Sequence, residues 1–411
     1  MSQSETLPRV IIAGGGIGGL TAALCLAQRG MQVELCEQAA EFGDAGAGIQ
    51  LSPNCSRVLH ALGLEAALKS KGFLPDGTQF RQWRTGRVIS ESTLGQAVID
   101  EYGAPYYHIH RGDLVQVLLD AARAQPGISL RAGVFVSGFA ETAEGVQVQL
   151  NHSHADQQAL ISNELRGEVL IGADGIHSTV RATLWGEDKP QFTGNVAWRA
   201  LVPVASLPQG MVLPKSTVWW GPGKHFVHYY VRGGALVNCV CVVEAADWQQ
   251  ESWTERGELG QLQAQFAGWH PSIAELIRNI DSASLYRWAL YDRAPMSTWG
   301  QGRVSLLGDA CHPTLPFMAQ GAAMAIEDAA VLASCLAQAT DGIDRALQRY
   351  EGLRRRRTAS IQTGSRRNAT VFHLSGVKAW LRDRAARRAG GATMRRLFSY
   401  NALTAADSHL S

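Results

Sequence analysis

Apolar residues at the start of the chain follow first a strand-like and then a helix-like spacing. Val10–Ala13 is an unbroken apolar run, and apolar residues then recur at helical spacing along Ile17–Ala27. A second run, Met31–Cys36, leads directly into Glu37. Strands that are buried on both faces read as continuous apolar runs, whereas helices repeat with a period near 3.6. The pattern therefore predicts a parallel strand–helix–strand unit.

Two further buried strands are expected much later in the chain, and each is followed by a glycine and an aspartate. Glu168–Gly172 precedes Asp174, and Gly302–Leu307 precedes Asp309. An alanine-rich helix is expected to open at Gly321. These strands have the buried character of the first two, so we assign them to the same domain.

Residues 188–295 show a different pattern, in which short runs of branched and aromatic residues are separated by turn signals. The expected strands are Val196–Val204, Thr217–Trp220, His225–Val231 and Leu236–Val243. This spacing is typical of an antiparallel sheet, to which Gln79–Ser92 is expected to add strands. Beyond residue 360, frequent arginines with broken helical periodicity indicate a helical tail that packs on the body or on a second subunit.

The predicted fold is α/β: a Rossmann-like dinucleotide-binding domain, an inserted antiparallel β-sheet domain for the substrate, and a C-terminal helical tail. The 411 residues are long enough for this organisation. The expected bounds are 1–75, 104–187 and 296–360 for the dinucleotide-binding domain, 76–103 and 188–295 for the substrate domain, and 361–411 for the tail.

Composition excludes several other classes of protein. The chain has 38 basic and 36 acidic residues, so no nucleic acid or other polyanion is expected as a partner. The one dense basic run, Arg354–Arg357, is interpreted as a solvated helix face. The seven scattered cysteines favour a reducing cytoplasm, and without a CxxC pair or HExxH no metal site is expected. Val10–Ala27 is rich in glycine and has no basic leader, so neither a signal peptide nor a membrane anchor is expected.

The glycines after the first strand have the spacing Gly14-x-Gly16-x-x-Gly19. In this motif Gly14 permits a tight turn, Gly16 lets the backbone approach a pyrophosphate, and Gly19 lets the helix pack on the strand. The helix N-terminus offers unpaired N–H groups to that pyrophosphate. Glu37 is placed to accept a hydrogen bond from a ribose hydroxyl, and the adjacent Gln38 is a further candidate contact. The motif predicts a dinucleotide but does not separate FAD from NAD.

Two later motifs favour FAD. In the first, the Asp174 carboxylate follows a strand end beside a helix start, and in the second Asp309 is placed to hydrogen-bond a chain of sugar-like hydroxyls. Gly321 and Ala322 open a helix whose N-terminus is expected to face the flavin pyrimidine edge, where it would stabilise the anion formed on reduction.

Three separated segments resemble the single-component FAD-dependent aromatic hydroxylases, the family of the p-hydroxybenzoate and salicylate hydroxylases. Besides the glycine motif, GADGIHSTVR (172–181) and GRVSLLGDACHPTLPFMAQGAAMAIEDAAVL (302–332) are similar to the DG and GD motifs of that family. The likeness covers roughly residues 8–360, with the motifs in the family's order.

The resemblance implies FAD as cofactor, NADH or NADPH as a transient electron donor without a domain of its own, molecular oxygen, and a small aromatic substrate. By the same resemblance, Arg111 reaches the FAD phosphate and ribityl region and Gln50 lies close to the cofactor. Val134 lies near the adenine end, and Asp174 helps to organise the cleft where the donor reacts. The oligomeric state is expected to be a monomer or a homodimer.

The implied reaction is hydroxylation of a phenolic or N-heteroaromatic, salicylate-like compound through a flavin C4a-hydroperoxide, in a pocket that excludes water. Strand alternation places His225, Val227 and Tyr229 on one face. Histidine has a suitable pKa to accept a phenolic proton, and positions matching His225 and Tyr229 contact substrate in relatives that hydroxylate hydroxynicotinate. His225 and Tyr229 are therefore the candidate catalytic pair. The alternative is that both are hydrogen-bonded within the sheet, and for His228 on the other face this alternative is favoured.

Residues near position 316 leave the substrate open. Pro316 is expected to shape the loop over the flavin with its carbonyl facing the substrate, and His312 to belong to the flavin-binding turn rather than to act as a base. Relatives acting on 3-hydroxybenzoate have a glutamine where this chain has Pro316, and hydroxynicotinate relatives have a histidine where it has Phe317. Neither substrate is thereby assigned.

Two other classes share the cofactor motifs. One is an FAD-dependent reductase or saturase that inserts no oxygen, against which the aromatic-lined middle of the chain argues. The other is a non-catalytic flavoprotein that senses redox state or ligand, in which the DG segment would have no evident use.

Overall fold

A five-stranded parallel sheet forms around the first predicted strand. The computed structural model describes residues 7–43, 46–153, 163–245 and 255–407. The order of the sheet is β17 (Val304–Leu306), β11 (Val169–Gly172), β1 (Arg9–Ala13), β2 (Gln32–Glu37) and β7 (Ile128–Ala132). All four neighbouring pairs are parallel, so the strands that precede Gly14, Ala173 and Leu307 end at one edge. The two later strands thus belong to the same sheet as the first two.

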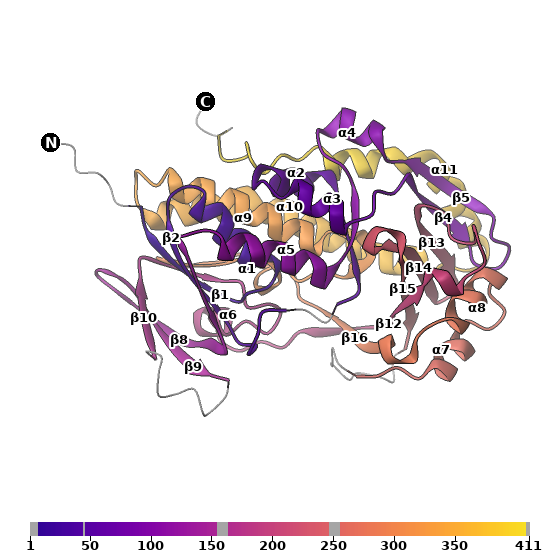
Figure 1. Ribbon diagram of the computed structural model, residues 1–411, viewed down its shortest axis with the longest axis horizontal. Helices are drawn as coiled ribbons and strands as arrows, with labels where there is room; N and C mark the ends of the chain where they lie inside the picture. The colour runs from indigo at the N-terminus through magenta and orange to yellow at the C-terminus, as the bar shows by residue number, and fades with distance from the viewer. Residues whose placement is uncertain (1–6, 44–45, 154–162, 246–254, 408–411) are drawn as a thin grey trace.

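Helices cover this sheet. Helix α1 (Ile17–Ala27) packs against α5 (Arg111–Arg123) and α9 (Gly321–Ala337), and α9 in turn contacts α2 (Pro53–Ala61) and α10 (Ile343–Phe372). The apolar spacing of α1 explains this position, because every residue from Leu20 to Leu26 is buried. Three short helices are α3 (Glu65–Lys71), α4 (Gln96–Tyr102) and α6 (Thr179–Trp185). In Figure 1, α9 and α10 run side by side along the long axis of the molecule.

Two small sheets flank the parallel sheet. One contains β8 (Val134–Thr142), β9 (Gly145–His152) and β10 (Glu164–Gly167). It lies at the opposite end of the molecule from the seven-stranded sheet described below, which we call the large sheet (Figure 1). The other pairs β3 (Gly48–Leu51) with β6 (Tyr107–His110). Strand β6 leads into α5 at Arg111, so this ribbon brings Gln50 and Arg111 to the same cavity.

A seven-stranded sheet forms the other half of the molecule. Its order is β16 (Tyr286–Asp292), β12 (Gln191–Pro203), β15 (Leu236–Glu244), β14 (Lys224–Val231), β13 (Lys215–Gly221), β4 (Gly77–Gln82) and β5 (Val88–Thr93). The predicted strands are present, and the segment 79–92 does add strands. One pairing is not antiparallel, because β4 lies parallel to β13. Strand β16 and the helices α7 (Leu259–Gln265) and α8 (Pro271–Arg278) were not predicted.

The two faces of this sheet have different partners. One face packs in an apolar cluster with α7 and α8, and that cluster includes Trp198, Phe226 and Cys241. The opposite face carries His225, Val227 and Tyr229 and lines a cavity. The alternation along His225–Tyr230 therefore sorts this strand as predicted. His228 is on the packed face beside Trp219, where burial lowers its pKa to about 3.

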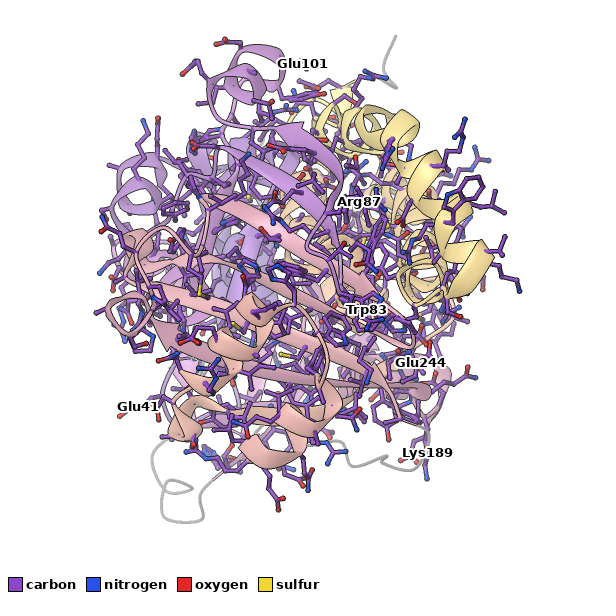
Figure 2. The ribbon with its side chains drawn as sticks, turned by 90° about the vertical axis from the view of Figure 1, so that its right-hand side faces the viewer. Glu41, Trp83, Arg87, Glu101, Lys189 and Glu244 are labelled. Atoms are coloured by element: carbon purple, nitrogen blue, oxygen red, sulfur yellow. The ribbon has the colours of Figure 1, made fainter. Side chains whose placement is uncertain are left out.

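The C-terminal residues form two long helices, which confirms the predicted helical tail although the apolar periodicity of this segment is broken. Helix α10 runs through to Phe372, so residue 361 lies within it, and α11 (Gly376–Phe398) packs against β5 along the edge of the large sheet. Figure 2 shows α11 in yellow beside this edge. Among the residues that the structure describes, no helix has the length and apolar character needed to cross a membrane.

The interpretation of Arg354–Arg357 as a solvated helix face is wrong for part of the run. Arg355 and Arg356 are exposed, but Arg354 is fully buried and Arg357 is half-buried. One helical turn separates Arg354 from Arg357, so both face α9, which carries the acidic pair Glu327 and Asp328. Four adjacent arginines thus divide between core and solvent by helical phase.

Candidate active site

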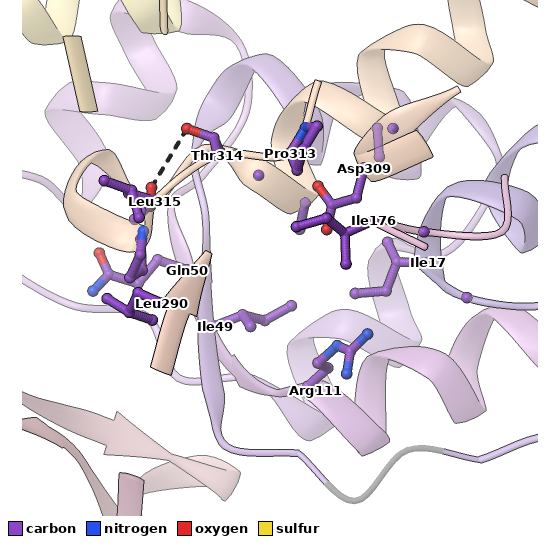
Figure 3. A pocket seen from close by; sticks show the side chains of 18 of the residues that line it. Ile17, Ile49, Gln50, Arg111, Ile176, Leu290, Asp309, Pro313, Thr314 and Leu315 are labelled. Atoms are coloured by element: carbon purple, nitrogen blue, oxygen red, sulfur yellow. Dashed lines mark hydrogen bonds between the residues drawn. The ribbon is translucent and has the colours of Figure 1, made fainter. Parts of the chain in front are cut away.

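A cavity of about 390 Å³ lies where the ends of the parallel strands meet the large sheet. The first turns of α1, α5 and α9 line one part of it, and β12, β14, β15 and β16 line another. Figure 3 shows Ile17, Ile176, Asp309 and Arg111 around one end and Gln50, Leu290 and Leu315 at the other. The cavity therefore has a strand-end region, near the glycine motif, and a sheet region under the seven strands.

The three motif glycines each meet a different steric demand. Gly14 has φ of +103°, and a Cβ atom there would lie 2.3 Å from the carbonyl oxygen of Ala173. A Cβ at Gly19 would lie 1.9 Å from the carbonyl oxygen of Gly14, so the turn and helix close only around glycine. At Gly16 a Cβ would meet nothing within 4 Å, and this residue lines the cavity. Gly14 and Gly19 are thus required by the fold, whereas Gly16 leaves room for a ligand to approach the backbone.

Two helices open at the cavity without a side-chain cap. Helix α1 begins after Gly16 and α9 after Gln320, and neither has a capping hydrogen bond from a side chain or an acidic residue in its first turn. Gly321 and Ala322 at the start of α9 line the cavity. Helix N-termini carry unsatisfied N–H groups and a partial positive charge, so both ends suit an anionic or electron-rich group.

Arg111 and Asp309 lie across the strand-end region from one another (Figure 3). The side chain of Arg111 passes against Gly46, where a Cβ would be 2.6 Å from the Cβ of Arg111. Asp309 is exposed to the cavity, which itself lies within the protein. This enclosure raises the pKa of its carboxyl, against the opposing effects of His312 and Arg111. The pair can offer a guanidinium to phosphate and a carboxylate to hydroxyl groups.

Three other candidate cofactor residues lie outside the cavity lining. Oε2 of Glu37 accepts a hydrogen bond from the backbone N–H of Gly15 at 2.7 Å, so this carboxylate is at the edge of the glycine turn. The carbonyl of Gln38 accepts from the hydroxyl of Ser153, and the Val134 side chain is buried in the core. Their proximity to a bound dinucleotide stays a prediction.

Asp174 has a structural role in this geometry. Its Oδ1 accepts from the Ser178 hydroxyl at 2.6 Å and its Oδ2 from the Val180 N–H at 3.1 Å, which holds the first turn of α6. The residues around it, Ala173, Gly175 and Ile176, line the cavity. Asp174 therefore acts on the cavity through the turn that it holds.

These features fit FAD. The open space at Gly16, the two uncapped helix ends and the Arg111–Asp309 pair form one continuous wall. Gly16 would admit the pyrophosphate at the turn that Gly14 and Gly19 allow. Arg111 and Asp309 would bind the phosphate and ribityl groups, and the α9 N-terminus would face the flavin ring.

The sheet region brings the candidate catalytic residues together. His225, Tyr229 and Pro316 all line it. Gln50 is fixed between the Tyr106 hydroxyl, from which its Oε1 accepts, and the Ser216 hydroxyl, to which its Nε2 donates. Tyr229 packs on the ring of His108, with centroids 4.6 Å apart, and burial raises its pKa above the ordinary value.

His225 is buried and hydrogen-bonded, though not within the sheet. Its Nδ1 lies 2.8 Å from Nε2 of His373, which follows the last residue of α10. Burial lowers the pKa of His225 well below its ordinary value, and His373 adds to the effect. The imidazole is therefore neutral near pH 7. Because Nδ1 is engaged by His373, Nε2 is the ring nitrogen available to a ligand in the cavity.

Phe317 and Pro316 have different positions. The ring of Phe317 lies 5.0 Å from that of His225 and is buried in an apolar cluster with Phe372 and Leu315. Pro316 lines the cavity and opens a short 3-10 turn, which ends at Ala319 in a left-handed conformation with φ of +52°. Phe317 thus packs against the His225 ring outside the cavity lining, whereas Pro316 lines the cavity.

Arg199 is a functional candidate that the sequence did not reveal. It lies on β12 and lines the sheet region, with its guanidinium 4.4 Å from the centre of the Trp288 ring. Arg199 is half-buried, and a cation in a largely apolar wall suits an anionic ligand. Strand periodicity could have placed Arg199 on a face, but nothing local indicated that this face meets the cofactor.

A second group that the sequence did not reveal joins α9 to its neighbouring helices. Glu327 is fully buried, and it is paired with Arg354 and Arg357 while accepting from Nδ2 of Asn54 at 2.6 Å. Although burial opposes ionisation, Arg354 and Arg357 hold the pKa of Glu327 below its ordinary value. The network fixes α9 to α2 and α10, and so fixes the helix end that meets the cavity.

His312 belongs to this supporting layer. Its Nε2 lies 2.5 Å from Oδ2 of Asp328, and the same oxygen accepts from the N–H of Gly308 at 3.1 Å. The ring is buried against Trp299. His312 therefore holds the turn that carries Asp309 and has no part in the cavity lining.

This dinucleotide cradle, joined to an apolar cavity under a β-sheet, defines a flavin-dependent oxidoreductase. A family model described as an FAD binding domain matches residues 8–365. The chain belongs to this family, which is that of the single-component FAD-dependent aromatic hydroxylases.

Similar proteins narrow the enzyme class. A 3-amino-4-hydroxybenzoate 2-monooxygenase from Streptomyces platensis is 38% identical, with 93% of each chain covered. A 3-hydroxybenzoate 6-hydroxylase from Klebsiella oxytoca is 38% identical, with 91% of each chain covered. Among solved structures, a salicylate hydroxylase substrate complex aligns with a TM-score of 0.80 at 26% identity, covering 98% of each chain. The protein is thus an FAD-dependent monooxygenase that hydroxylates aromatic compounds, which confirms that prediction over the reductase and sensor alternatives.

Proposed function

We propose that the protein hydroxylates a small aromatic acid that carries a ring hydroxyl, with molecular oxygen as co-substrate and NADH or NADPH as the electron donor. The observation that carries this proposal is the position of Arg199, His225 and Tyr229 on one wall of the cavity. A cation for a carboxylate and a neutral base for a phenol are thereby within reach of one small ring.

The flavin, when bound at the strand-end region, supplies the activated oxygen. The chain's own residues bind and orient the substrate. Arg199 binds the carboxylate, Nε2 of His225 accepts the hydrogen bond from the ring hydroxyl, and Tyr229 contacts the ring edge. Removal of the phenolic proton raises the electron density on the ring carbon that receives the oxygen atom.

The apolar part of the wall keeps water away from the reaction. Leu290, Leu315, Pro316 and Val240 line the sheet region, and few polar groups interrupt them. Exclusion of water strengthens the hydrogen bonds of His225 and Arg199, and it suppresses hydrolytic side reactions.

The names of the relatives support a hydroxybenzoate-like substrate. Those from Streptomyces platensis and Klebsiella oxytoca act on ring-hydroxylated benzoates by name, and the aligned structure is a salicylate hydroxylase. Because the chain has Pro316 and Phe317 at the two positions that differ among such relatives, the pattern of ring substituents is left to the assay.

The donor is proposed to bind transiently, since the described residues form a single dinucleotide cradle. A cytoplasmic location is proposed on the cysteines, all seven of which are free and buried. The protein is proposed to act as a monomer or a homodimer.

The test is a substrate panel on the purified yellow protein. Oxidation of NADH and of NADPH is followed with salicylate, 3-hydroxybenzoate, 3-amino-4-hydroxybenzoate and 6-hydroxynicotinate, and with phenol and aniline as ligands without a carboxylate. We expect at least one acid to accelerate donor oxidation and to yield a product with one added oxygen. If phenol or aniline is hydroxylated and no acid is, the assignment of an acid substrate is overturned.

A further inference from the structure

The buried position of His225 raises the question of where a substrate proton goes. The ring lies 5.0 Å from Phe317 and 5.4 Å from Phe372, so its surroundings are apolar. A charged imidazolium is costly in such a place. A base here works best if each proton that it accepts at one nitrogen is passed on from the other.

A continuous path leads from His225 to the surface. Nδ1 of His225 is 2.8 Å from Nε2 of His373, and Nδ1 of His373 is 2.9 Å from Oε1 of Glu244. The His373 side chain is 2% exposed, whereas that of Glu244 is 57% exposed. The path therefore begins in the cavity and ends in water. Figure 2, which views the molecule from the side of the large sheet, labels Glu244.

One turn holds both outer members of the path. The N–H of Gly223 donates to the carbonyl of His373 at 3.1 Å, and the N–H of Glu244 donates to the carbonyl of Gly223 at 2.9 Å. The hairpin between β13 and β14 thus fixes the end of α10 and the end of β15 against each other. His225 lies on the second residue of β14, next to the same turn.

The Glu244 carboxylate determines which ring nitrogens of His373 and His225 carry a hydrogen. An ionised carboxylate can only accept, so Nδ1 of His373 must carry a hydrogen. In the neutral ring Nε2 is then an acceptor, and Nδ1 of His225 must donate to it. Neutral His225 is left with Nε2 as an acceptor that faces the cavity. The tautomers are inferred from the hydrogen-bond network, with Glu244 as the group that fixes its direction.

We propose that Glu244 and His373 form a proton relay that orients His225 as an acceptor and carries the substrate's phenolic proton to the surface. His373 and Glu244 are positioning residues, because they act through His225. The inference rests on the proposed function of His225 as the group that receives that proton.

The relay conserves protons and has a means of resetting. The substrate hydroxyl gives its proton to Nε2 of His225, whose Nδ1 proton passes to Nε2 of His373. The Nδ1 proton of His373 passes to Glu244 and then to water. Both rings are left in the opposite tautomer, and a proton that returns along the same path to the newly formed phenolate restores them.

The charged groups around the relay are consistent with neutral histidines. Burial lowers the pKa of His373, Glu244 opposes this, and Arg382 on α11 adds to the lowering. Arg382 is itself paired with Asp383 and lies over the ring of Trp220. Besides burial, the neighbouring His373 ring is the one contribution among the described residues to the lowered pKa of His225.

The test reads the tautomers directly in FAD-loaded protein labelled with ¹⁵N-histidine. Long-range ¹H–¹⁵N spectra at pH 7.5 report which ring nitrogen is protonated, and His225→Gln and His373→Gln assign the two rings. We expect both rings as Nδ1–H in the wild type. Glu244→Met removes the acceptor at the solvent end, so we expect His225 to change to Nε2–H. Glu244→Asp is expected to retain the wild-type tautomers, and Glu91→Met, at an exposed carboxylate on the same sheet, is the matched control.

Kinetics provide the second readout, with the acid that the panel selects as substrate. We expect Glu244→Met to lower kcat at least about tenfold with little change in KM, because the acceptor nitrogen of His225 is then blocked. Rescue by Glu244→Asp and an unchanged Glu91→Met would support the relay. Wild-type His225 found as Nε2–H, or an unaltered His225 tautomer in Glu244→Met, overturns it. Hydroxylation that survives His225→Gln instead overturns the proposed role of His225 itself, so the two failures are distinguishable.

Discussion

Nε of Arg354 donates to Oδ1 of Asp328 at 2.6 Å, and neither side chain is exposed. Asp328 also bonds His312 and the N–H of Gly308, and the neighbouring Glu327 pairs with the same arginine. One buried cation thus ties α10 to α9 and to the turn that presents Asp309.

Arg354→Met is expected to destabilise the protein by about 3–5 kcal/mol, because it removes the cation that two buried carboxylates share and leaves Glu327 with Arg357 and Asp328 with His312 as their remaining ionisable partners. Urea unfolding with excess FAD measures this. Arg356→Met, two residues along on the exposed face, is the control and is expected to change stability by less than about 0.5 kcal/mol. Equal effects of the two substitutions would contradict the assignment of Arg354 to the core.

Gly16→Ala and Gly19→Ala are expected to fail in different ways. A Cβ at Gly16 meets no protein atom, so that variant should fold but retain little FAD after gel filtration. A Cβ at Gly19 would lie 1.9 Å from a backbone oxygen, so that variant should lose stability or not accumulate. Flavin absorbance per protein and thermal unfolding by circular dichroism separate the two. Full FAD content in folded Gly16→Ala would show that the open space is not the cofactor's.

His225→Gln is expected to keep near-normal FAD content while hydroxylation falls by roughly 10²–10⁴-fold, the range for loss of a general base. Product formation is measured by mass spectrometry alongside donor oxidation. His228→Gln, on the opposite face of the same strand, is the matched control and should leave turnover close to wild type. Loss of FAD from His225→Gln would show that the residue serves the cofactor instead.

Arg199→Gln is expected to raise KM for the carboxylated substrate by about tenfold to a hundredfold, since charge-assisted hydrogen bonds contribute about 1.5–3 kcal/mol. Binding of an uncarboxylated ligand such as phenol, followed by flavin absorbance, should change little. A similar loss of affinity for both ligands would argue that Arg199 supports the sheet through Trp288 and does not bind the carboxylate.

Acid is expected to destabilise the fold before its carboxylates titrate. Burial lowers the pKa of His108 and of His228 to about 3, whereas the unfolded chain has histidine pKa values near 6.5. Below pH 6.5 these two histidines bind protons in the unfolded state but stay neutral in the folded state, so the free energy of unfolding falls by ~1.4 kcal/mol per pH unit for each histidine. Urea unfolding between pH 7.5 and 5 measures the slope. His228→Gln should reduce it by that amount, and an unchanged slope would contradict the predicted shift.

The sequence by itself determined the parts of this protein whose causes are local. The buried strand before Gly14, the helix after it and the acidic strand end at Glu37 follow from hydrophobic spacing and from the steric needs of a tight turn. Strand alternation was likewise enough to place His225 and Tyr229 on one face and His228 on the other. The family motifs added the cofactor, because they preserve the spacing of residues that hold it.

The tertiary structure alone decided the features that depend on distant segments. His373 meets His225 across 148 positions of the chain, and Arg354 is buried because α9 presents two carboxylates to it. Periodicity reports which face of an element is apolar and cannot report which charged partner will cover a polar position. The helical periodicity after residue 360 looks broken for this reason, because some of its polar positions are covered by charged partners from other segments. Arginines that pair with buried acids or cover the edge of a sheet look, in sequence, like a solvated surface.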